Sequence, residues 1–153
     1  MGGNFFTVDF PLGKVVVYTG REDVIDKVIF DLSDEFPRHP SRSPEARLVE
    51  RYLAGEEVSL ALKVDLAGES AFRRKVYREV MRIPYGKTRT YGEVAALSGC
   101  PGGARGVGQA MAANRTPLII PCHRVVSAGG KIGGFSSGVE VKKFLLTLEG
   151  FLR

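Results

Sequence analysis

The sequence predicts an α+β protein with a small N-terminal sheet-plus-helix domain over residues 1–68 and a mainly helical C-terminal domain with a helix-turn-helix over residues 69–153. Two β-type runs around a Pro-Leu-Gly turn open the chain, whereas apolar residues recur at helical spacing beyond residue 70. The charge changes sign at the same place. Residues 1–70 carry 8 Lys and Arg against 13 Asp and Glu, net −5, and residues 71–153 carry 14 against 4, net +10. With 153 residues, the chain is long enough for two small domains.

The N-terminal elements follow from turn and cap chemistry. Pro11 and Gly13 turn one alternating run, rich in β-branched and aromatic residues, into the next, which predicts a hairpin. Ser43 can cap a helix whose first turn suits Pro44, and Gly55 ends that helix. The expected elements are therefore strands at 4–10 and 14–19, a strand or short helix at 24–30, a helix at 44–54 and an extended link at 58–68.

The C-terminal elements are predicted mainly from helix caps. Ser70 can cap a helix that ends before Pro84, and Thr90 with Glu93 fits the capping box S/T-x-x-E. Two short helices across a tight Gly-containing turn indicate a helix-turn-helix. The expected elements are helices from 70 to before 84, over 90–97 and to about 113, a short apolar strand at 117–120 and a helix that ends near 149.

The expected helix that ends near residue 113 has an unusual composition, Gly-Gly-Ala-Arg-Gly-Val-Gly-Gln-Ala from residue 102. Each glycine costs about 1 kcal/mol relative to alanine in a helix, so something should compensate. One explanation is close packing against another helix. The other is that a face of small residues lets backbone enter a narrow groove, with Arg105 as the long side chain projecting from it.

Composition and charge restrict the partners. The basic half is expected to bind a polyanion, with nucleic acid as the first candidate and a surface used only for solubility as the alternative. No apolar run reaches the ~18 residues that cross a bilayer, and the first ten residues do not resemble a signal peptide. Two cysteines cannot form a disulfide framework. We therefore expect a cytoplasmic protein without a membrane partner, and the scarcity of Asn and Gln suggests a thermophilic source.

The segment Pro-Cys-His-Arg-Val-Val at 121–126 is the candidate chemical centre. A thiol with an ordinary pKa is mostly protonated at neutral pH, so a nucleophilic cysteine needs a base or a positive field, and the residues after Cys122 offer both. The alternative is an inert core cysteine beside a structural His123. A zinc site is not expected, because its four ligands would be spread over both halves without paired spacing.

Glu149 is the third candidate catalytic residue. It follows Val141 and Leu145 at intervals of four, so it falls on the apolar stripe of the C-terminal helix, with Gly150 as the expected C-cap. A carboxylate there faces the core and the negative end of the helix dipole, so it requires a donor. If His123 is that donor, the three residues form a nucleophile, a base and an orienting group. A solvent-exposed Glu149 at a frayed helix end is the alternative.

The residues from about 70 to 150 resemble the O6-alkylguanine-DNA alkyltransferases, also called methylated-DNA–protein-cysteine S-methyltransferases. The resemblance rests on the motifs Pro-Cys-His-Arg-Val-Val at 121–126, Thr-Tyr-Gly-Glu-Val-Ala at 90–95, Ala-Arg-Gly-Val-Gly at 104–108, Asn114 and Leu-Glu-Gly at 148–150. The N-terminal half resembles the family only in its plan.

The resemblance implies a single-use repair enzyme. Cys122 would accept the alkyl group of an O6-alkylguanine flipped out of double-stranded DNA, with His123 acting through water as its base, Glu149 orienting the imidazole and Asn114 beside them. Tyr91 and Arg105 would extrude the nucleotide from the minor groove. The DNA-binding residues are expected to be Tyr91, Arg105, Thr90, Ala104, Gly106 and Arg115. The substrate pocket is expected to be lined by Tyr91, Pro117, Val125, Phe135 and Ser136, under a flexible glycine-rich loop at 129–138.

The resemblance also implies a monomer without a cofactor. Phe135 stands where some members have tyrosine, and the cysteine-free N-terminal half predicts no zinc site of the kind that some members carry there. Relatives that bind the lesion without repairing it lack the cysteine, so Cys122 favours repair. The alternatives are a non-catalytic module that recognises alkylated DNA or regulates through its helix-turn-helix, and a cysteine hydrolase.

Overall fold

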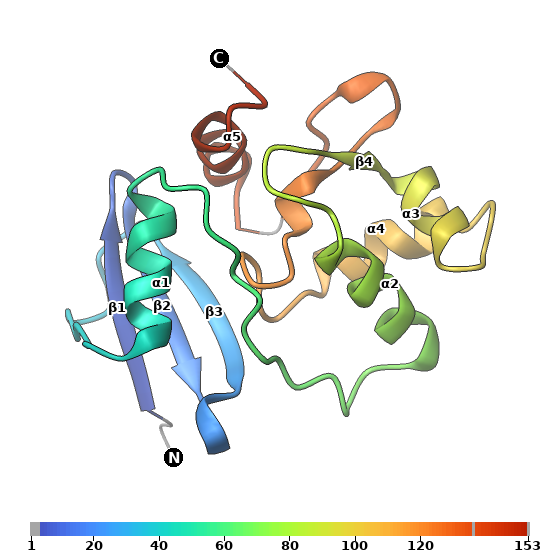
Figure 1. Cartoon of the computed structure of the whole chain (residues 1–153). Helices are drawn as coiled ribbons and strands as arrows, with labels where there is room; N and C mark the ends of the chain where they lie inside the picture. The colour runs from blue at the N-terminus through green and yellow to red at the C-terminus, as the bar shows by residue number, and fades with distance from the viewer. Residues whose placement is uncertain (1–3, 136, 153) are drawn as a thin grey trace. The chain divides into compact units, whose positions relative to one another are not determined.

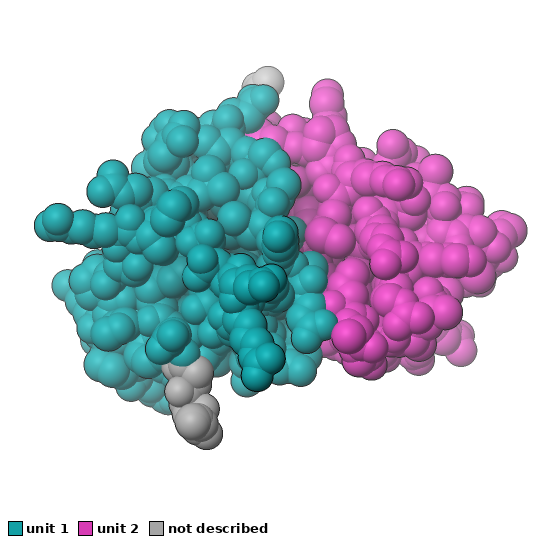
Figure 2. Space-filling view, turned by 60° about the horizontal axis from the view of Figure 1, so that its bottom comes forward, with its two compact units in different colours: residues 1–65, 115–119 teal, residues 66–114, 120–153 magenta. Residues whose placement is uncertain are grey.

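The computed structural model describes residues 4–135 and 137–152, which form two compact units. Unit 1 comprises the chain up to residue 65 together with residues 115–119, and unit 2 comprises residues 66–114 and the chain from residue 120 (Figure 2). The sequence suggested one cut between residues 68 and 69. In the structure, five residues from the middle of the second half, 115–119, belong to unit 1.

Unit 1 is a three-stranded antiparallel sheet with one helix on its face (Figure 1). The strands are β1 (Asn4–Phe10), β2 (Gly13–Thr19) and β3 (Ile25–Asp31), in the order β1-β2-β3, and a short 3-10 turn, η1 (Arg21–Asp23), precedes β3. Helix α1 (Pro44–Leu53) packs against β1. Three successive valines at 15–17 are completely buried, so both faces of β2 are covered.

The segment at 24–30, which the sequence left open between strand and helix, is a strand. It pairs antiparallel with β2 in the register Val15 with Phe30 and Val17 with Val28. The Val28 N–H also donates to the Arg115 carbonyl at 2.9 Å. Its conformation is determined by pairing with segments that are distant in the sequence. The local pattern of apolar residues contains no information about such pairing.

Unit 2 is mainly helical, and its helices begin where the sequence predicts caps. The Ser70 side chain accepts from Arg73 N–H, and Thr90 with Glu93 forms the complete capping box. The elements are α2 (Ala71–Met81), β4 (Arg89–Thr90), α3 (Tyr91–Leu97), α4 (Ala104–Ala112), η2 (Cys122–Arg124), β5 (Val125–Val126), η3 (Ala128–Gly130) and α5 (Val139–Leu148). Helices α2, α3 and α4 pack against one another, and β4 pairs with β5 in parallel.

The predicted strand at 117–120 is wrong. Leu118 has a φ of 80°, in the left-handed region, so the segment turns instead of extending. Its apolar residues are buried, which explains why the sequence resembles a strand.

The glycines of α4 have different roles. A Cβ on Gly106 would lie 3.1 Å from the Phe72 ring, so this glycine permits α4 to approach α2 closely. A Cβ on Gly108 would have no heavy atom within 4 Å beyond the local chain. The packing explanation of the glycine-rich helix therefore holds for Gly106 and does not account for Gly108.

Within the described ranges 4–135 and 137–152, no helix has the length and apolar character that a bilayer crossing requires.

We predict that Gly108→Ala raises the free energy of unfolding by about 0.5–1 kcal/mol, because alanine is the better helix former and its methyl group meets open space. Gly106→Ala should give no gain or a loss, since its methyl group presses on Phe72. Urea denaturation of both variants and the unchanged protein measures the difference. Equal stabilisation by the two substitutions would contradict the assigned packing role of Gly106.

Candidate active site

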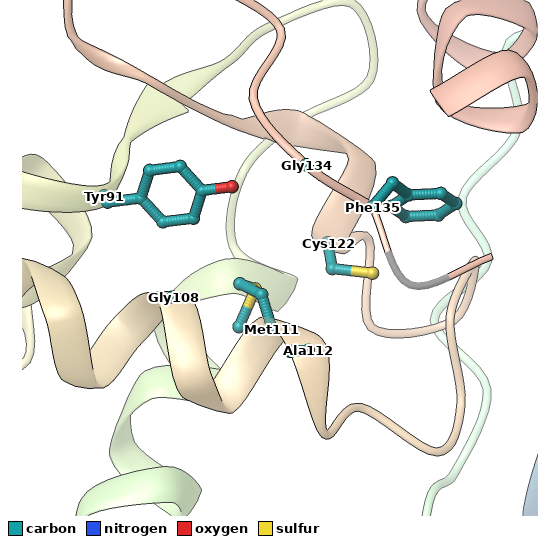
Figure 3. Close-up of a pocket in the computed structure, with 7 residues that line it drawn as sticks. All are labelled: Tyr91, Gly108, Met111, Ala112, Cys122, Gly134 and Phe135. Atoms are coloured by element: carbon teal, nitrogen blue, oxygen red, sulfur yellow. The ribbon is translucent and has the colours of Figure 1, made fainter. Parts of the chain in front are cut away.

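Cys122 is the first residue of η2, and its side chain lies in the wall of a cavity of about 290 Å³ (Figure 3). The residue is buried, with 2% of its surface exposed. The cavity is lined by Tyr91, Gly108, Met111, Ala112, Cys122, Gly134 and Phe135. Helix α4 supplies three of these residues, α3 supplies the tyrosine, and the segment before α5 supplies the last two. The cysteine therefore faces a space large enough for a small organic group.

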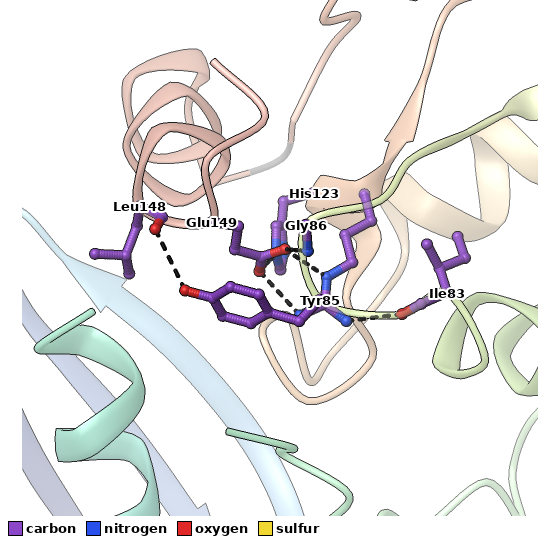
Figure 4. Close-up of polar contacts among 7 residues, drawn as sticks. Ile83, Tyr85, Gly86, His123, Leu148 and Glu149 are labelled. Carbon is purple, nitrogen blue, oxygen red and sulfur yellow. Dashed lines mark hydrogen bonds and ion pairs between the residues drawn. The ribbon is translucent and has the colours of Figure 1, made fainter. Parts of the chain in front are cut away.

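The Glu149 carboxylate contacts the two residues that follow Cys122 and accepts four hydrogen bonds (Figure 4). His123 Nε2 lies 2.7 Å from Oε2. Arg124 donates from Nε to Oε1 and from Nη2 to Oε2, both at 2.9 Å, and Gly86 N–H donates to Oε1 at 3.0 Å. Glu149 and His123 are both buried, so the carboxylate on the apolar stripe of α5 has the partner that the sequence requires.

Arg124 completes a rigid support around this carboxylate. Its Nη1 donates to the Ile83 carbonyl at 2.8 Å, and its guanidinium lies 5.9 Å from the centroid of the Tyr85 ring. The Tyr85 hydroxyl in turn donates to the Leu148 carbonyl at 3.3 Å. The arginine, which the sequence offered as a source of positive field for the thiol, thus has its charge matched by Glu149.

The imidazole of His123 is held neutral. Burial lowers its pKa below the usual 6.5, although the hydrogen bond to Glu149 acts in the opposite direction. The lowering prevails because burial is the largest effect on this pKa, and the positive charges of Arg124 and Lys142 act in the same direction. Since Glu149 accepts from Nε2–H, the basic nitrogen of the neutral ring is Nδ1.

The thiol of Cys122 is also held neutral. Burial raises its pKa to about 11, and this effect outweighs the hydrogen bond from Asn114 and the positive charge of Lys142, which both lower the pKa. Asn114 is itself fixed, because its Nδ2 donates to the Ile120 carbonyl at 3.0 Å. The resting site therefore contains a protonated thiol, so the nucleophile must be generated by proton transfer.

Lys142 is a contributor that sequence reasoning missed. It is completely buried on α5, where its Nζ donates to the Val125 carbonyl at 2.7 Å and to the Gly134 carbonyl at 3.1 Å. A signal was available in the sequence, because Lys142 precedes the buried Leu146 by one helical interval of four. The cavity residues Gly108, Met111 and Ala112 were also missed, since their position depends on how α4 packs.

Tyr91 is brought to the cavity by the capping box. Thr90 caps α3, so Tyr91 is its first residue, and the ring is directed to the side where Cys122 and Phe135 lie (Figure 3). Burial raises the pKa of the Tyr91 hydroxyl above 10. A Cβ on Gly133, which has a φ of 76°, would lie 3.1 Å from this hydroxyl, so the loop passes close to the tyrosine.

The other residues predicted to bind DNA or to line the substrate pocket are spread over α4, unit 1 and the cavity wall. Ala104, Arg105 and Gly106 form the first turn of α4, and the Arg105 side chain is exposed. Arg115 and Pro117 belong to unit 1, where Arg115 lies 3.9 Å from Asp26 and Pro117 is buried. Phe135 lines the cavity, Val125 offers its carbonyl to Lys142, and Ser136 lies outside the described residues.

The described residues contain no cluster of three or more His, Cys, Asp and Glu side chains able to hold a metal ion.

Comparison with known proteins decides the family. The chain matches the family model described as 6-O-methylguanine DNA methyltransferase, DNA binding domain, over residues 71–151. It is 41% identical to the methylated-DNA–protein-cysteine methyltransferase of Mycolicibacterium paratuberculosis, over 94% of this chain and 90% of the relative. The chain belongs to the methylated-DNA–protein-cysteine methyltransferase family. The family that the sequence motifs suggested is thereby confirmed.

Solved structures of this methyltransferase family share the fold. The Mycobacterium tuberculosis protein OGT in complex with DNA superposes with a TM-score of 0.78 at 36% identity, covering 95% of this chain and 91% of that protein. The O6-methylguanine-DNA methyltransferase of the hyperthermophilic archaeon Pyrococcus kodakaraensis gives a TM-score of 0.73 at 27% identity, covering 95% and 98%. These similarities confirm the predicted α+β class over nearly the whole chain.

The neutral state of His123 leads to a testable pH dependence. Its pKa is about 6.5 in the unfolded chain and lower in the native protein, so below pH 6.5 the unfolded state binds more protons. Stability should fall by up to about 1.4 kcal/mol per pH unit as the pH decreases from 6.5 toward the native pKa. Urea denaturation between pH 6.5 and about 5.5 measures this slope. A His123→Asn variant should lack it, and an unchanged slope in that variant would assign the titration to another group.

Proposed function

We propose that the protein repairs DNA by moving an alkyl group from O6 of an alkylated guanine to Sγ of Cys122. The observation that carries this proposal is the position of the Cys122 thiol, in the wall of a cavity and directly before the buried His123–Glu149 pair. The family match and the DNA complex of the Mycobacterium tuberculosis relative support DNA as the partner.

The chemistry is a proton transfer followed by a displacement. His123 Nδ1 accepts the thiol proton through a water molecule, and Glu149 stabilises the imidazolium while it exists. The thiolate then attacks the alkyl carbon, the bond from that carbon to O6 breaks, and the released guanine takes up a proton. A stable thioether remains, so each molecule acts once and the reaction requires no cofactor.

The route of the lesion into the cavity is the second part of the proposal. Helices α3 and α4 would act as a helix-turn-helix whose second helix enters the minor groove, with Thr90, Ala104 and Gly106 near the backbone. Tyr91 would crowd the adjacent phosphate, and Arg105 would fill the space that the flipped nucleotide leaves. Extrusion is required because the alkylated oxygen lies inside the duplex. We expect a cytoplasmic monomer to suffice for this reaction.

The acceptor assignment predicts the fate of a labelled methyl group. Incubation with duplex DNA carrying methyl-labelled O6-methylguanine should place one methyl group per protein molecule on the peptide that contains Cys122. Cys122→Ala should abolish transfer, because no thiolate can form at that position. Cys100→Ala is the matched control and should transfer normally, since Cys100 is an exposed free cysteine in the turn between α3 and α4.

Two outcomes of that labelling experiment would contradict the proposal. Transfer that persists in Cys122→Ala would place the acceptor elsewhere. Lasting binding of the lesion, with its methyl group still on guanine, would favour the non-catalytic recognition module.

The extrusion role predicts a selective defect in Arg105→Ala. Transfer from a lesion in duplex DNA should slow by roughly tenfold or more, because unstacking costs a few kcal/mol and Arg105 offsets part of it. Transfer from the same lesion in a single strand should change much less. The measurement is the single-turnover rate on both substrates, with Arg47→Ala, an exposed arginine of α1, as the control. Equal slowing on both substrates would contradict the role.

A further inference from the structure

Lys142 is a buried charged group of unit 2 that the proposed mechanism does not use. It has no exposed surface, whereas its neighbour Lys143 on the same helix is exposed. Removing an ammonium group from water is costly unless hydrogen bonds compensate. Here Nζ donates to two carbonyl oxygens, those of Val125 and Gly134. Lysine is rarely buried in this way, so the position suggests a function.

The two carbonyls belong to two different segments, both of which follow the reacting cysteine along the chain. Val125 is three residues beyond Cys122 and pairs with Arg89 in the β4–β5 sheet. Gly134 lies on the loop before α5 and, like Cys122, lines the cavity. One ammonium group on α5 therefore connects the strand that follows the nucleophile to the loop that forms the cavity wall.

The charge of Lys142 is directed at the same thiol. It favours the thiolate of Cys122. Burial lowers the pKa of Lys142 to about 8 even though the thiolate in return acts to raise it. Arg124 is less suited to this role, since its guanidinium is paired with both oxygens of Glu149. The hydrogen-bond partners of Lys142 are neutral carbonyls, so its positive charge is not cancelled at close range.

We propose that Lys142 is a positioning residue for alkyl transfer: its ammonium group fixes the Val125 strand to the Gly134 loop and stabilises the Cys122 thiolate as it forms. The inference rests on the proposed function, because it concerns the same thiol. The other groups around that thiol are neutral at rest: Asn114, the imidazole of His123 and the hydroxyls of Tyr77 and Tyr91. Among the described residues that act on this thiol, Lys142 is then the cation available to a thiolate that must form in a buried site.

Two substitutions separate the structural role from the electrostatic one. Lys142→Met retains the length of the side chain and removes both the hydrogen bonds and the charge. Lys142→Gln removes the charge and retains a hydrogen-bond donor on a shorter side chain. Lys143→Met is the matched control, one residue along the same helix and exposed.

The first measurement is alkylation of Cys122 by iodoacetamide as a function of pH, without DNA. Both Lys142 variants should react about tenfold more slowly at neutral pH, with the apparent thiol pKa moved upward, because the thiolate has lost its nearby cation. The second measurement is the single-turnover rate of methyl transfer from a duplex lesion. It should fall in both variants and fall further in Lys142→Met, while affinity for undamaged duplex stays within about twofold of the original.

These measurements distinguish failure of the Lys142 inference from failure of the proposed function. Thiol reactivity and transfer rates equal to those of Lys143→Met would overturn the inference, and so would loss of the native fold in both Lys142 variants, which would make Lys142 a purely structural lysine. If the unsubstituted protein transfers no methyl group to Cys122, the proposed function fails. The iodoacetamide profile then still reports whether Lys142 acts on the thiol.

Discussion

The buried carboxylate of Glu149 is the interaction on which the rest of unit 2 depends. It joins three segments that are distant in the sequence: the end of α5, the turn at Gly86 and the η2 residues His123 and Arg124. A carboxylate in this position without donors would be strongly destabilising, so all three segments must come together for unit 2 to be stable. The position of Cys122 follows, because it is the residue directly before the histidine that the carboxylate holds.

The site keeps both the base and the nucleophile neutral at rest. Arg124 matches the charge of Glu149, while burial keeps the His123 imidazole neutral and able to accept a proton. The thiol is kept protonated by burial, and the positive charge of Lys142, buried on α5, counteracts that effect. A site built in this way is unreactive at rest and becomes nucleophilic only through proton transfer. That behaviour suits a protein that can react only once, since a premature reaction of the thiol would end its use.

Local chemistry explains which features could be predicted from the sequence. The caps at Ser43, Ser70 and Thr90 depend on residues within one helical turn, and the structure has all three. Glu149 could be predicted because a carboxylate on an apolar stripe demands a partner. The features that depend on packing between distant segments could not, and these include the strand at 25–31 and the cavity residues of α4. Lys142 lay between the two cases. Its interval of four to the apolar Leu146 could be read from the sequence, whereas its carbonyl partners could not.

The turn at Leu118 also affects how the protein can be divided. Residues 115–119 belong to unit 1, so the backbone crosses between the units at residue 65, again after Asn114 and a third time before Ile120. A fragment cut at residue 69 would carry that loop without the sheet that buries it and would expose its apolar side chains to water. The 3-10 turn η2, which begins with Cys122, starts two residues beyond the last crossing. Unit 1 therefore includes residues from both halves of the chain, and truncation or domain exchange at a single junction would divide it.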